Sequence, residues 1–215
     1  MKKAGLLFGL IAVLVLMVGT VWAADSQPSA KATAVINKLY AIPMTAADST
    51  EWVTVHSQQI KTANAKDLFM DVALQCGIFT RTKSELKVGG DSSTAEGKIE
   101  VRVLVDSDVA EPGEVVYDKR VQTLNTELYQ ALMTSAGLPI DNIGYVELIL
   151  ETLQAHAFNF VIADVGPGVH TITVQAKVAS SESGNATAMA AVGMGSTTIE
   201  SVRMIKGEDI IYDLP

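Results

Sequence analysis

The sequence contains a single cysteine, Cys76, among 215 residues. One thiol excludes an internal disulfide and any Cys-rich zinc site. Basic residues are also scarce, with 16 Lys and Arg against 24 Asp and Glu. The resulting net charge of −8 argues against a general nucleic-acid binder, because such proteins need clustered Lys and Arg to displace counterions from phosphates. We therefore expect no nucleic-acid partner.

Sequence motifs of catalysis are lacking as well. None of the three histidines has a metal-ligand neighbour at i+2 or i+4. No Gly-x-Ser-x-Gly motif is present, and Gly193-Met194-Gly195-Ser196 is not a phosphate loop because no Gly-Lys follows. These absences predict a protein that is not an enzyme. A secreted hydrolase stays open as an alternative, with a site that distant residues would build, such as His56, Asp71 and Asp164.

The composition is that of a folded domain. Apolar residues make up 48% of the chain and charged residues 19%, which is too apolar and too weakly charged for a disordered chain. Cys76 has the same parity as Leu68, Met70, Val72 and Leu74 in a strand-like run, so we expect it to be a buried small hydrophobe. A catalytic cysteine would need a local histidine and a polarising partner.

The N-terminus has the three parts of a secretory signal peptide. Met1-Lys2-Lys3 is a positive n-region, the apolar run of residues 6–18 follows, and Val21-Trp22-Ala23 offers a cleavage site after Ala23. We expect residues 1–23 to be removed and the protein to be secreted, periplasmic or held at the cell surface. In the alternative reading the apolar residues 4–24 remain as a membrane anchor, since 21 residues span a bilayer.

Most of the remaining chain reads as short strands. Residues 24–50 read as a linker or N-terminal arm, with a short helical turn near residues 35–40. From Glu51 the period changes to two, most clearly where Ile99, Val101, Val103 and Val105 alternate with polar residues. Further strands are expected at residues 52–60, 67–76, 78–83, 115–121, 157–163, 169–178 and 186–192, and from 196 to 205 with a bulge between Ile199 and Val202. Residues 180–185 read as a loop, and residues 207–215 as a C-terminal tail.

Residues 123–156 follow a different period. Asn125 is a fair N-cap for a helix over residues 126–133, and Gly137 would end it before Pro139. Val146, Ile149, Leu150 and Leu153 fall at i, i+3, i+4 and i+7, which predicts a second, amphipathic helix. The overall prediction is an all-β antiparallel sandwich of about eight or nine strands over residues 51–206, jelly-roll-like, with a one- or two-helix insertion.

The late strands carry a family resemblance. Phe158-Asn159-Phe160, the glycine-rich turn, residues 168–176 and residues 197–203 resemble the late strands of secreted jelly-roll proteins of the C1q/TNF-like type. The resemblance covers residues 51–206 and implies a jelly roll and a homo-oligomer. The helical insertion departs from the compact C1q/TNF pattern, and no functional residue carries over.

One loop indicates a cation. Four carboxylates lie within nine residues on the turn between two strands, and they could offer a hard cation several oxygens: Asp106, Asp108, Glu111 and Glu114. Calcium is the candidate cofactor, and a solvated turn is the alternative. Aromatic platforms for a glycan are few, with Trp52 and the strand residue Tyr117 as candidates.

These features together predict an exported protein that acts by binding or assembly. Its expected partners are a second copy of itself or an unknown protein or glycan ligand, and a membrane only if residues 4–24 stay as an anchor. The small-residue strand of residues 186–192 has no charged side chain. We expect this strand either to be overlaid tightly by another part of the fold or to be an edge against a partner subunit.

Overall fold

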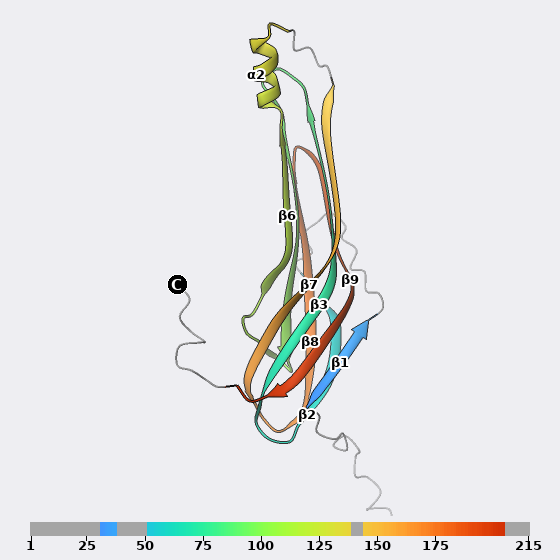
Figure 1. Ribbon diagram of the computed structural model, residues 1–215, viewed down its shortest axis with the longest axis vertical. Helices are drawn as coiled ribbons and strands as arrows, with labels where there is room; N and C mark the ends of the chain where they lie inside the picture. The colour runs from blue at the N-terminus through green and yellow to red at the C-terminus, as the bar shows by residue number, and fades with distance from the viewer. Residues whose placement is uncertain (1–30, 38–50, 139–143, 205–215) are drawn as a thin grey trace, which may run out of the picture.

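A computed structural model describes residues 31–37, 51–138 and 144–204 of the chain. Within these ranges the protein has nine strands and one helix, and it is elongated, with most strands running along its length (Figure 1). The expected signal peptide, most of the expected arm and the expected tail lie outside the described residues. No helix in the described ranges is long and apolar enough to cross a membrane.

The strands form two antiparallel sheets. Sheet A has the order β1 (Ala32–Asn37), β9 (Asn185–Val202), β3 (Lys66–Glu85) and β7 (Tyr145–Val165). Sheet B has the order β2 (Val53–Thr62), β8 (Gly168–Ser183) and β4 (Ser92–Val105). Both β6 (Val115–Asn125) and the two-residue β5 (Asp108–Val109) pair with β4.

This strand order is that of a jelly roll. Apart from β5, the eight strands divide as first, eighth, third and sixth in sheet A, and as second, seventh, fourth and fifth in sheet B. Two four-stranded sheets linked in this way are the double Greek key of jelly-roll proteins. The sequence prediction of an all-β sandwich is confirmed.

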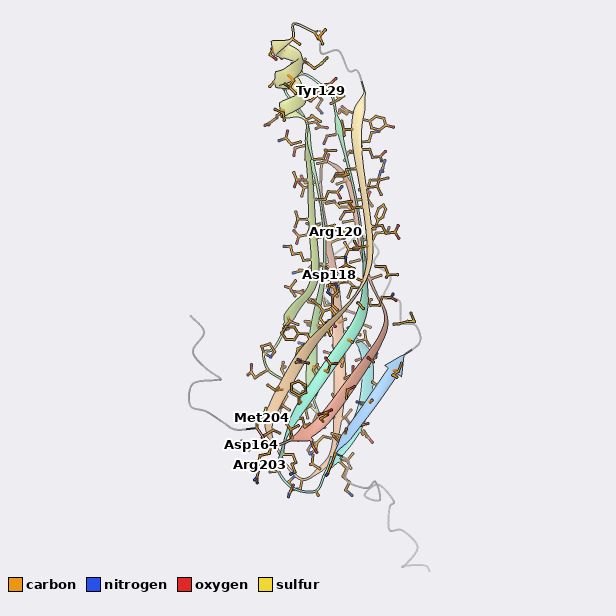
Figure 2. The ribbon with its side chains drawn as sticks, viewed as in Figure 1. Asp118, Arg120, Tyr129, Asp164, Arg203 and Met204 are labelled. Atoms are coloured by element: carbon orange, nitrogen blue, oxygen red, sulfur yellow. The ribbon has the colours of Figure 1, made fainter. Side chains whose placement is uncertain are left out.

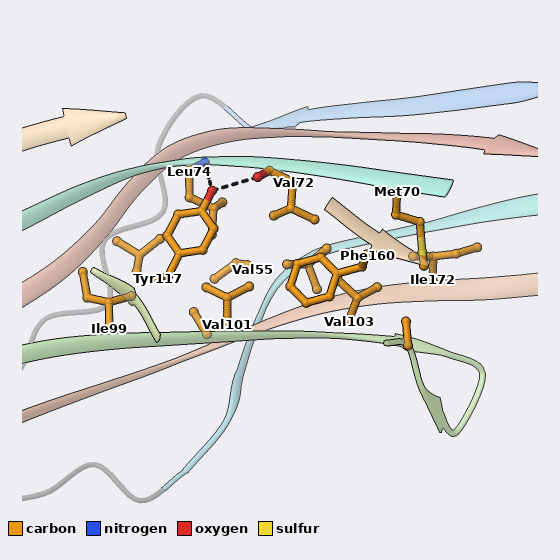
Figure 3. Packing of buried hydrophobic residues seen from close by; sticks show 14 of the residues in the cluster. Val55, Met70, Val72, Leu74, Ile99, Val101, Val103, Tyr117, Phe160 and Ile172 are labelled. Carbon is orange, nitrogen blue, oxygen red and sulfur yellow. Dashed lines mark hydrogen bonds between the residues drawn. The ribbon is translucent and has the colours of Figure 1, made fainter. Parts of the chain in front are cut away.

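The lower half of the sandwich has an apolar core. Leu68, Met70, Val72 and Leu74 of β3 face Val101 and Val103 of β4, and all six side chains are buried. Figure 3 shows this layer with Phe160 and Ile172 beside it. Burying each such side chain stabilises the fold by about 1.5–3 kcal/mol, so the core of the lower half carries most of the stability.

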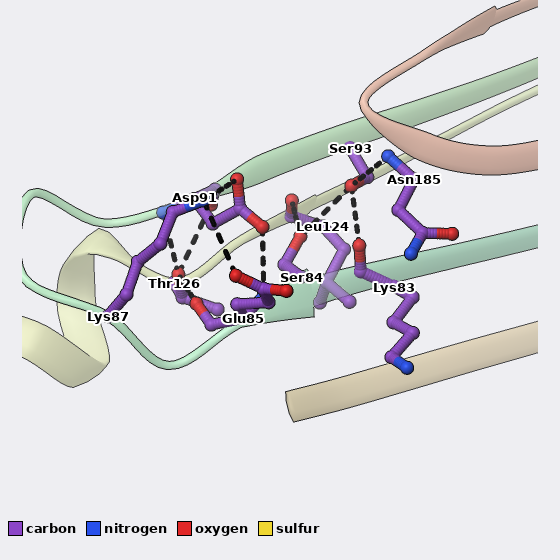
Figure 4. Close-up of polar contacts among 9 residues, drawn as sticks. All are labelled: Lys83, Ser84, Glu85, Lys87, Asp91, Ser93, Leu124, Thr126 and Asn185. Atoms are coloured by element: carbon purple, nitrogen blue, oxygen red, sulfur yellow. Dashed lines mark hydrogen bonds and ion pairs between the residues drawn. The ribbon is translucent and has the colours of Figure 1, made fainter. Parts of the chain in front are cut away.

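The interior becomes polar in the upper half. The inward positions of β3 continue as Thr80, Thr82 and Ser84, each with 0% of its surface exposed. Gln122 of β6 accepts a hydrogen bond from Thr80 Oγ1 at 2.8 Å and donates to Thr82 Oγ1 at 2.7 Å. Near the tip, Thr126, Asp91 and Glu85 form a further network (Figure 4). Buried hydrogen bonds therefore join the two sheets in the upper half, beside small apolar contacts such as those of Ala188 and Ala190.

The prediction of a second helix is wrong. The first helix is confirmed as α2 (Glu127–Ser135), but Val146, Ile149, Leu150 and Leu153 lie in β7. Their spacing fits a helix, yet residues 145–150 are apolar at nearly every position. Such a run fits neither the period of 3.6 of an amphipathic helix nor the period of two of a half-buried strand. Continuous pairing with β3, from Leu68 opposite Ile162 to Glu85 opposite Tyr145, supplies the backbone hydrogen bonds and overrides the local pattern.

Three smaller predictions are also corrected. Residues 32–37 form β1 and not a helical turn, because they pair with residues 195–200 of β9. The bulge in β9 lies where the pairing with β3 shifts between Val192 and Gly195, not between Ile199 and Val202. The expected loop at 180–185 is a tight turn at Gly184, whose φ of 72° suits glycine.

Candidate functional site

The four acidic residues predicted to bind calcium are not gathered into a site. Asp106 Oδ2 lies 2.9 Å from His170 Nδ1, and Glu114 pairs with Arg102 at 3.2 Å. Glu111 exchanges backbone hydrogen bonds with Val161, and Asp108 lies exposed in β5. In the described ranges no three His, Cys, Asp or Glu side chains are close enough to hold a metal ion. Of the four carboxylates, Asp106 and Glu114 are thus engaged by side chains of β8 and β4.

Asp106 instead holds two turns together. Its backbone is left-handed, with φ of 57°, and its second carboxylate oxygen accepts the Thr171 N–H at 2.8 Å. The hydrogen bond from His170 and the one from Thr171 lower the pKa of the Asp106 carboxyl. The other ring nitrogen of His170 lies 2.9 Å from the Gly166 carbonyl. This contact joins the turn after β4 to the turn before β8.

The predicted alternative site of His56, Asp71 and Asp164 is not assembled in this structure. His56 is 3% exposed, and its Nδ1 lies 2.6 Å from Thr197 Oγ1 of the opposite sheet. Desolvation lowers the pKa of His56. Asp71 belongs to the outward-facing positions of β3, whereas Asp164 lies near the end of β7 at the lower end of the sandwich (Figure 2). The three side chains thus lie in different parts of the sandwich.

Cys76 is buried, as predicted. Its side chain is 0% exposed, and desolvation, with a smaller contribution from Asp118, raises its pKa to about 12. A neutral, enclosed thiol is a poor nucleophile. Cys76 therefore acts as a core residue.

The two candidate glycan platforms are both engaged by the protein itself. Arg102 and Lys177 lie over the Trp52 ring, with the guanidinium carbon and the ammonium nitrogen 4.3 and 4.6 Å from the ring centroid. Tyr117 is 8% exposed and points into the core (Figure 3). The prediction that Tyr117 could be a surface platform is wrong, because its hydroxyl is needed inside.

The small-residue strand at 186–192 is overlaid by the opposite sheet. Ala188, Ala190 and Val192 are buried, and a Cβ on Gly97 of β4 would lie 2.8 Å from Ile78 Cγ2 and 3.8 Å from Ala190 Cβ. This stretch is thus tightly overlaid, and among the described residues it also lies at an edge of sheet A, since β3 is its partner on one side and β1 pairs only with residues 195–200.

The edge strands of the two sheets differ in their protection, and in the described part of the chain residues 185–194 of β9 form a further edge because β1 pairs only with residues 195–200. Edge strands attract other strands, and proteins shield them by shortness, charge or bulges. β1 has six residues, β2 carries a bulge between Thr54 and His56, and β6 carries Lys119 and Arg120. β7 pairs with β3 without a bulge from Tyr145 to Ile162, and over residues 145–159 its charged side chains are Glu147 and Glu151.

The outer side of β7 has a free backbone over half its length. Leu86 N–H, just after β3, donates to Gly144 O, just before β7, and this bond continues the pairing of the two strands. The backbone N–H and C=O groups of the even-numbered β7 residues therefore point toward β3. Val161 exchanges two hydrogen bonds, of 2.8 and 2.9 Å, with Glu111 on the opposite side. The backbone N–H and C=O groups of the odd-numbered residues therefore point away from β3. Among the described residues no strand pairs with this side between Tyr145 and Asn159.

The same stretch exposes large apolar side chains on both faces of sheet A. On the outward face Tyr145, Ile149 and Leu153 are 55%, 55% and 65% exposed. On the inward face Val146, Leu148, Leu150 and Phe158 are 39–44% exposed. We call residues 145–159 of β7 the free edge. An unpaired backbone and apolar side chains on both faces are the two features that a strand partner needs.

Side chains from β6 hold the free edge in place. The Tyr117 hydroxyl accepts the Leu74 N–H at 3.1 Å and lies 2.7 and 2.5 Å from the carbonyls of Val72 and His156. Arg120 donates to Ile78 O and to Thr152 Oγ1 (Figure 2 labels Arg120). Gln122 Nε2 donates to Leu148 O at 2.8 Å. The free edge is thus tied to sheet B before any partner arrives, which lowers the entropy cost of binding.

Apolar surface continues around the free edge. A hollow of about 310 Å³ lies at the height of Gly77 and Ala191, and Leu153 and Met189 also line it. At the tip, α2 buries none of its residues, and Leu128 and Leu132 are 73% and 60% exposed. Grouped apolar surface of this kind is typical of interaction sites.

Sequence reasoning missed the free edge because it assigned residues 145–153 to a helix. The signal was present in the apolar run Tyr145-Val146-Glu147-Leu148-Ile149-Leu150, interrupted by Glu147 alone, which suits a strand with both faces covered better than an amphipathic helix. The second cover is absent from the described part of the chain.

Comparisons with known proteins give no family. No family model matches the chain, and no curated protein sequence matches it. Among solved structures it is similar to a chain of "Structure of infectious bursal disease virus Gx strain", with 10% identity over 83% of this chain, 33% of that chain and a TM-score of 0.36. A second match, "Structure of infectious bursal disease virus Gt strain", has 8% identity, covers 83% and 43% of the two chains and has a TM-score of 0.18. The chain thus spans a third to under half of these chains, and TM-scores of this size do not establish a shared function.

Proposed function

We propose that this chain is an exported, non-enzymatic jelly-roll protein that acts by assembly, and that the free edge of β7 is the surface through which it assembles. The observation that carries the proposal is the combination of outward backbone groups and exposed apolar side chains on one unprotected edge strand. A jelly roll alone fixes no function, whereas an exposed, unpaired edge strand is a surface that can bind another strand. The signal-like N-terminus supports export to an extracytoplasmic location.

The absence of a binding role would leave the free edge unexplained. A long, flat, apolar edge strand is prone to uncontrolled aggregation, and β1, β2 and β6 carry protection. Residues 185–194 of β9 also lie at an edge, but they expose two large apolar side chains, Met189 and Met194, against seven on residues 145–159 of β7. The free edge is also fastened by Tyr117, Arg120 and Gln122, so it is ordered rather than frayed. An ordered, unprotected edge fits strand addition by a partner.

The experiment measures the sedimentation coefficient of a fluorescently labelled chain in the mixture of proteins that its cells export. A fluorophore is attached to Val88→Cys, which is 73% exposed near the tip, while buried Cys76 stays unlabelled. The chain is added at nanomolar concentration to the unfractionated material that producing cells export, and fluorescence-detected sedimentation reports its size. Leu150→Lys places a charge that a strand partner would bury, and Val121→Lys on β6, 53% exposed at present, is the matched control.

We expect the unmodified edge and Val121→Lys to sediment as a complex, and Leu150→Lys to sediment as a monomer. Circular dichroism confirms that all variants fold. Sedimentation of all three as monomers, or of all three as the same complex, would overturn the proposal.

The membrane-tethered form of this function makes a separate prediction. If residues 1–23 are cleaved, the intact mass of the exported protein corresponds to residues 24–215. A mass that includes residues 1–23 would show that the anchor is retained. The protein would then act while tethered to the membrane and not after release.

A further inference from the structure

We infer that the partner at the free edge is a second copy of this chain, paired antiparallel about a two-fold axis that passes through Thr152; the inference rests on the proposed function and adds the partner's identity. A two-fold axis perpendicular to sheet A would join the two copies into one continuous sheet of twice the width. The free edge would then be closed on both copies at once.

The backbone geometry selects this register. The residues whose backbone N–H and C=O groups point to the free edge are the odd-numbered ones from Tyr145 to Asn159. The midpoint of that stretch is Thr152. A two-fold axis there pairs each outward residue of one copy with one of the other and leaves none over. The hydrogen-bonded pairs are then 145 with 159, 147 with 157, 149 with 155, and 151 with 153.

The side chains are compatible in this register. Glu147 of one copy lies opposite Ala157 of the other, and Glu151 lies opposite Leu153, so no two carboxylates face each other directly. Shifting the axis by one residue, to Glu151, would place the two Glu151 side chains opposite each other, which is destabilising. On the inward face Val146 meets Phe158, an aromatic and β-branched pair of the favourable kind.

An ion pair within each copy also neutralises a charge at the free edge before dimerisation. Arg81 of β3 pairs with Glu147 on the outward face of the same copy. The carboxylate of Glu147 therefore has its counter-charge before a second copy arrives. Burial of this edge then requires no unpaired charge at position 147.

The surface is large enough for a stable dimer. Two edges of 15 residues each, with seven large apolar side chains that are 39–65% exposed on each copy, could bury up to about 1,200 Å² in total. That area lies within the range of specific interfaces, which begins at about 1,000 Å². A single short peptide would cover less of the free edge.

The test is a cysteine scan along β7 in the exported protein. Cys76 is buried and has a pKa raised to about 12, so engineered thiols are the reactive ones. Thr152→Cys should form a covalent dimer, since opposed Cα atoms about 4.5 Å apart at a non-hydrogen-bonded pair suit a disulfide. Glu147→Cys and Ala157→Cys should each stay monomeric alone and cross-link when the two chains are mixed.

Val116→Cys on β6, where the side chain is 57% exposed, is the matched control and should give no dimer. Cross-linking of Glu147→Cys or Ala157→Cys with itself, or no cross-linking at Thr152, would overturn the inference. If the labelled chain still sediments as a complex that Leu150→Lys dissociates, the free edge binds a different protein, and only the proposed function survives.

Discussion

Tyr117 shows how one side chain can join two sheets. Its hydroxyl satisfies the Leu74 N–H and reaches the carbonyls of Val72 and His156, and burial raises the pKa of the phenol. Tyr117→Phe would leave buried backbone groups without that partner. We expect a loss of about 1–3 kcal/mol in the free energy of unfolding, measured by chemical denaturation.

Tyr129→Phe on the exposed helix α2 is the control for this loss and should change stability by less than about 0.5 kcal/mol. Equal effects of the two substitutions would show that the Tyr117 hydroxyl does not brace the sheets.

His56 makes stability depend on pH. Its folded pKa is lowered by desolvation from an ordinary value of about 6.5, so between the two pKa values the unfolded chain binds more protons. The stabilising contribution is therefore present above about pH 6.5 and is lost as the pH falls below it, by at most about 1.4 kcal/mol per pH unit. His56→Gln should lose this slope. Since His156 and His170 are common to both chains, identical pH profiles between pH 7 and 5 would contradict the account.

Gly195 permits a close approach between β9 and β3. A Cβ there would lie 2.5 Å from Leu74 Cδ2 and 2.7 Å from the Ala73 carbonyl, so the backbone would have to shift. Gly195→Ala should cost about 1–3 kcal/mol, as overpacked core positions do. Gly166→Ala, where nothing lies within 4 Å of the new Cβ, is the control and should be nearly neutral in thermal unfolding. A neutral Gly195→Ala would show that β9 does not lie as close to β3 and β2 as described.

At the scale of elements, proline substitutions can distinguish the two edges of β7, because proline has no N–H to donate. Ile149 directs its N–H to the free edge and Leu150 directs its N–H to β3. Ile149→Pro removes no hydrogen bond within the chain, whereas Leu150→Pro removes one from the ladder. We expect Leu150→Pro to lower the free energy of unfolding by at least about 2 kcal/mol more than Ile149→Pro does. The reverse order in a denaturation experiment would place the free edge on the wrong side.

The elements also show what the sequence could predict. The strict alternation from Ile99 to Val105 predicted β4, and the parity of Cys76 predicted its burial, because both depend on local period. Pairing partners lie far apart in the chain, so the acidic residues Asp106 and Glu114 were read as ligands, whereas His170 and Arg102 engage them. The strand β7 was missed because its partner β3 decides its conformation.

The whole molecule divides into an apolar base and an extension with a polar interior. The base contains the buried core around Val72, Val101 and Phe160, and the extension relies on Thr80, Thr82 and Gln122. The free edge runs along the extension (Figure 1), where the inward side chains Val146, Leu148 and Leu150 of β7 stay 40–44% exposed. This division places stability at one end and the proposed assembly surface at the other.

Amide hydrogen exchange, resolved by residue with NMR, tests the assembly surface most directly. In dilute monomer the even-numbered amides of residues 146–158 should be protected by β3, and the odd-numbered amides of residues 145–159 should exchange freely. In the concentrated protein we expect the odd-numbered amides to slow by at least about 100-fold, because strand addition gives them partners. Odd-numbered amides that exchange at the same rate in dilute, concentrated and exported samples would contradict the account.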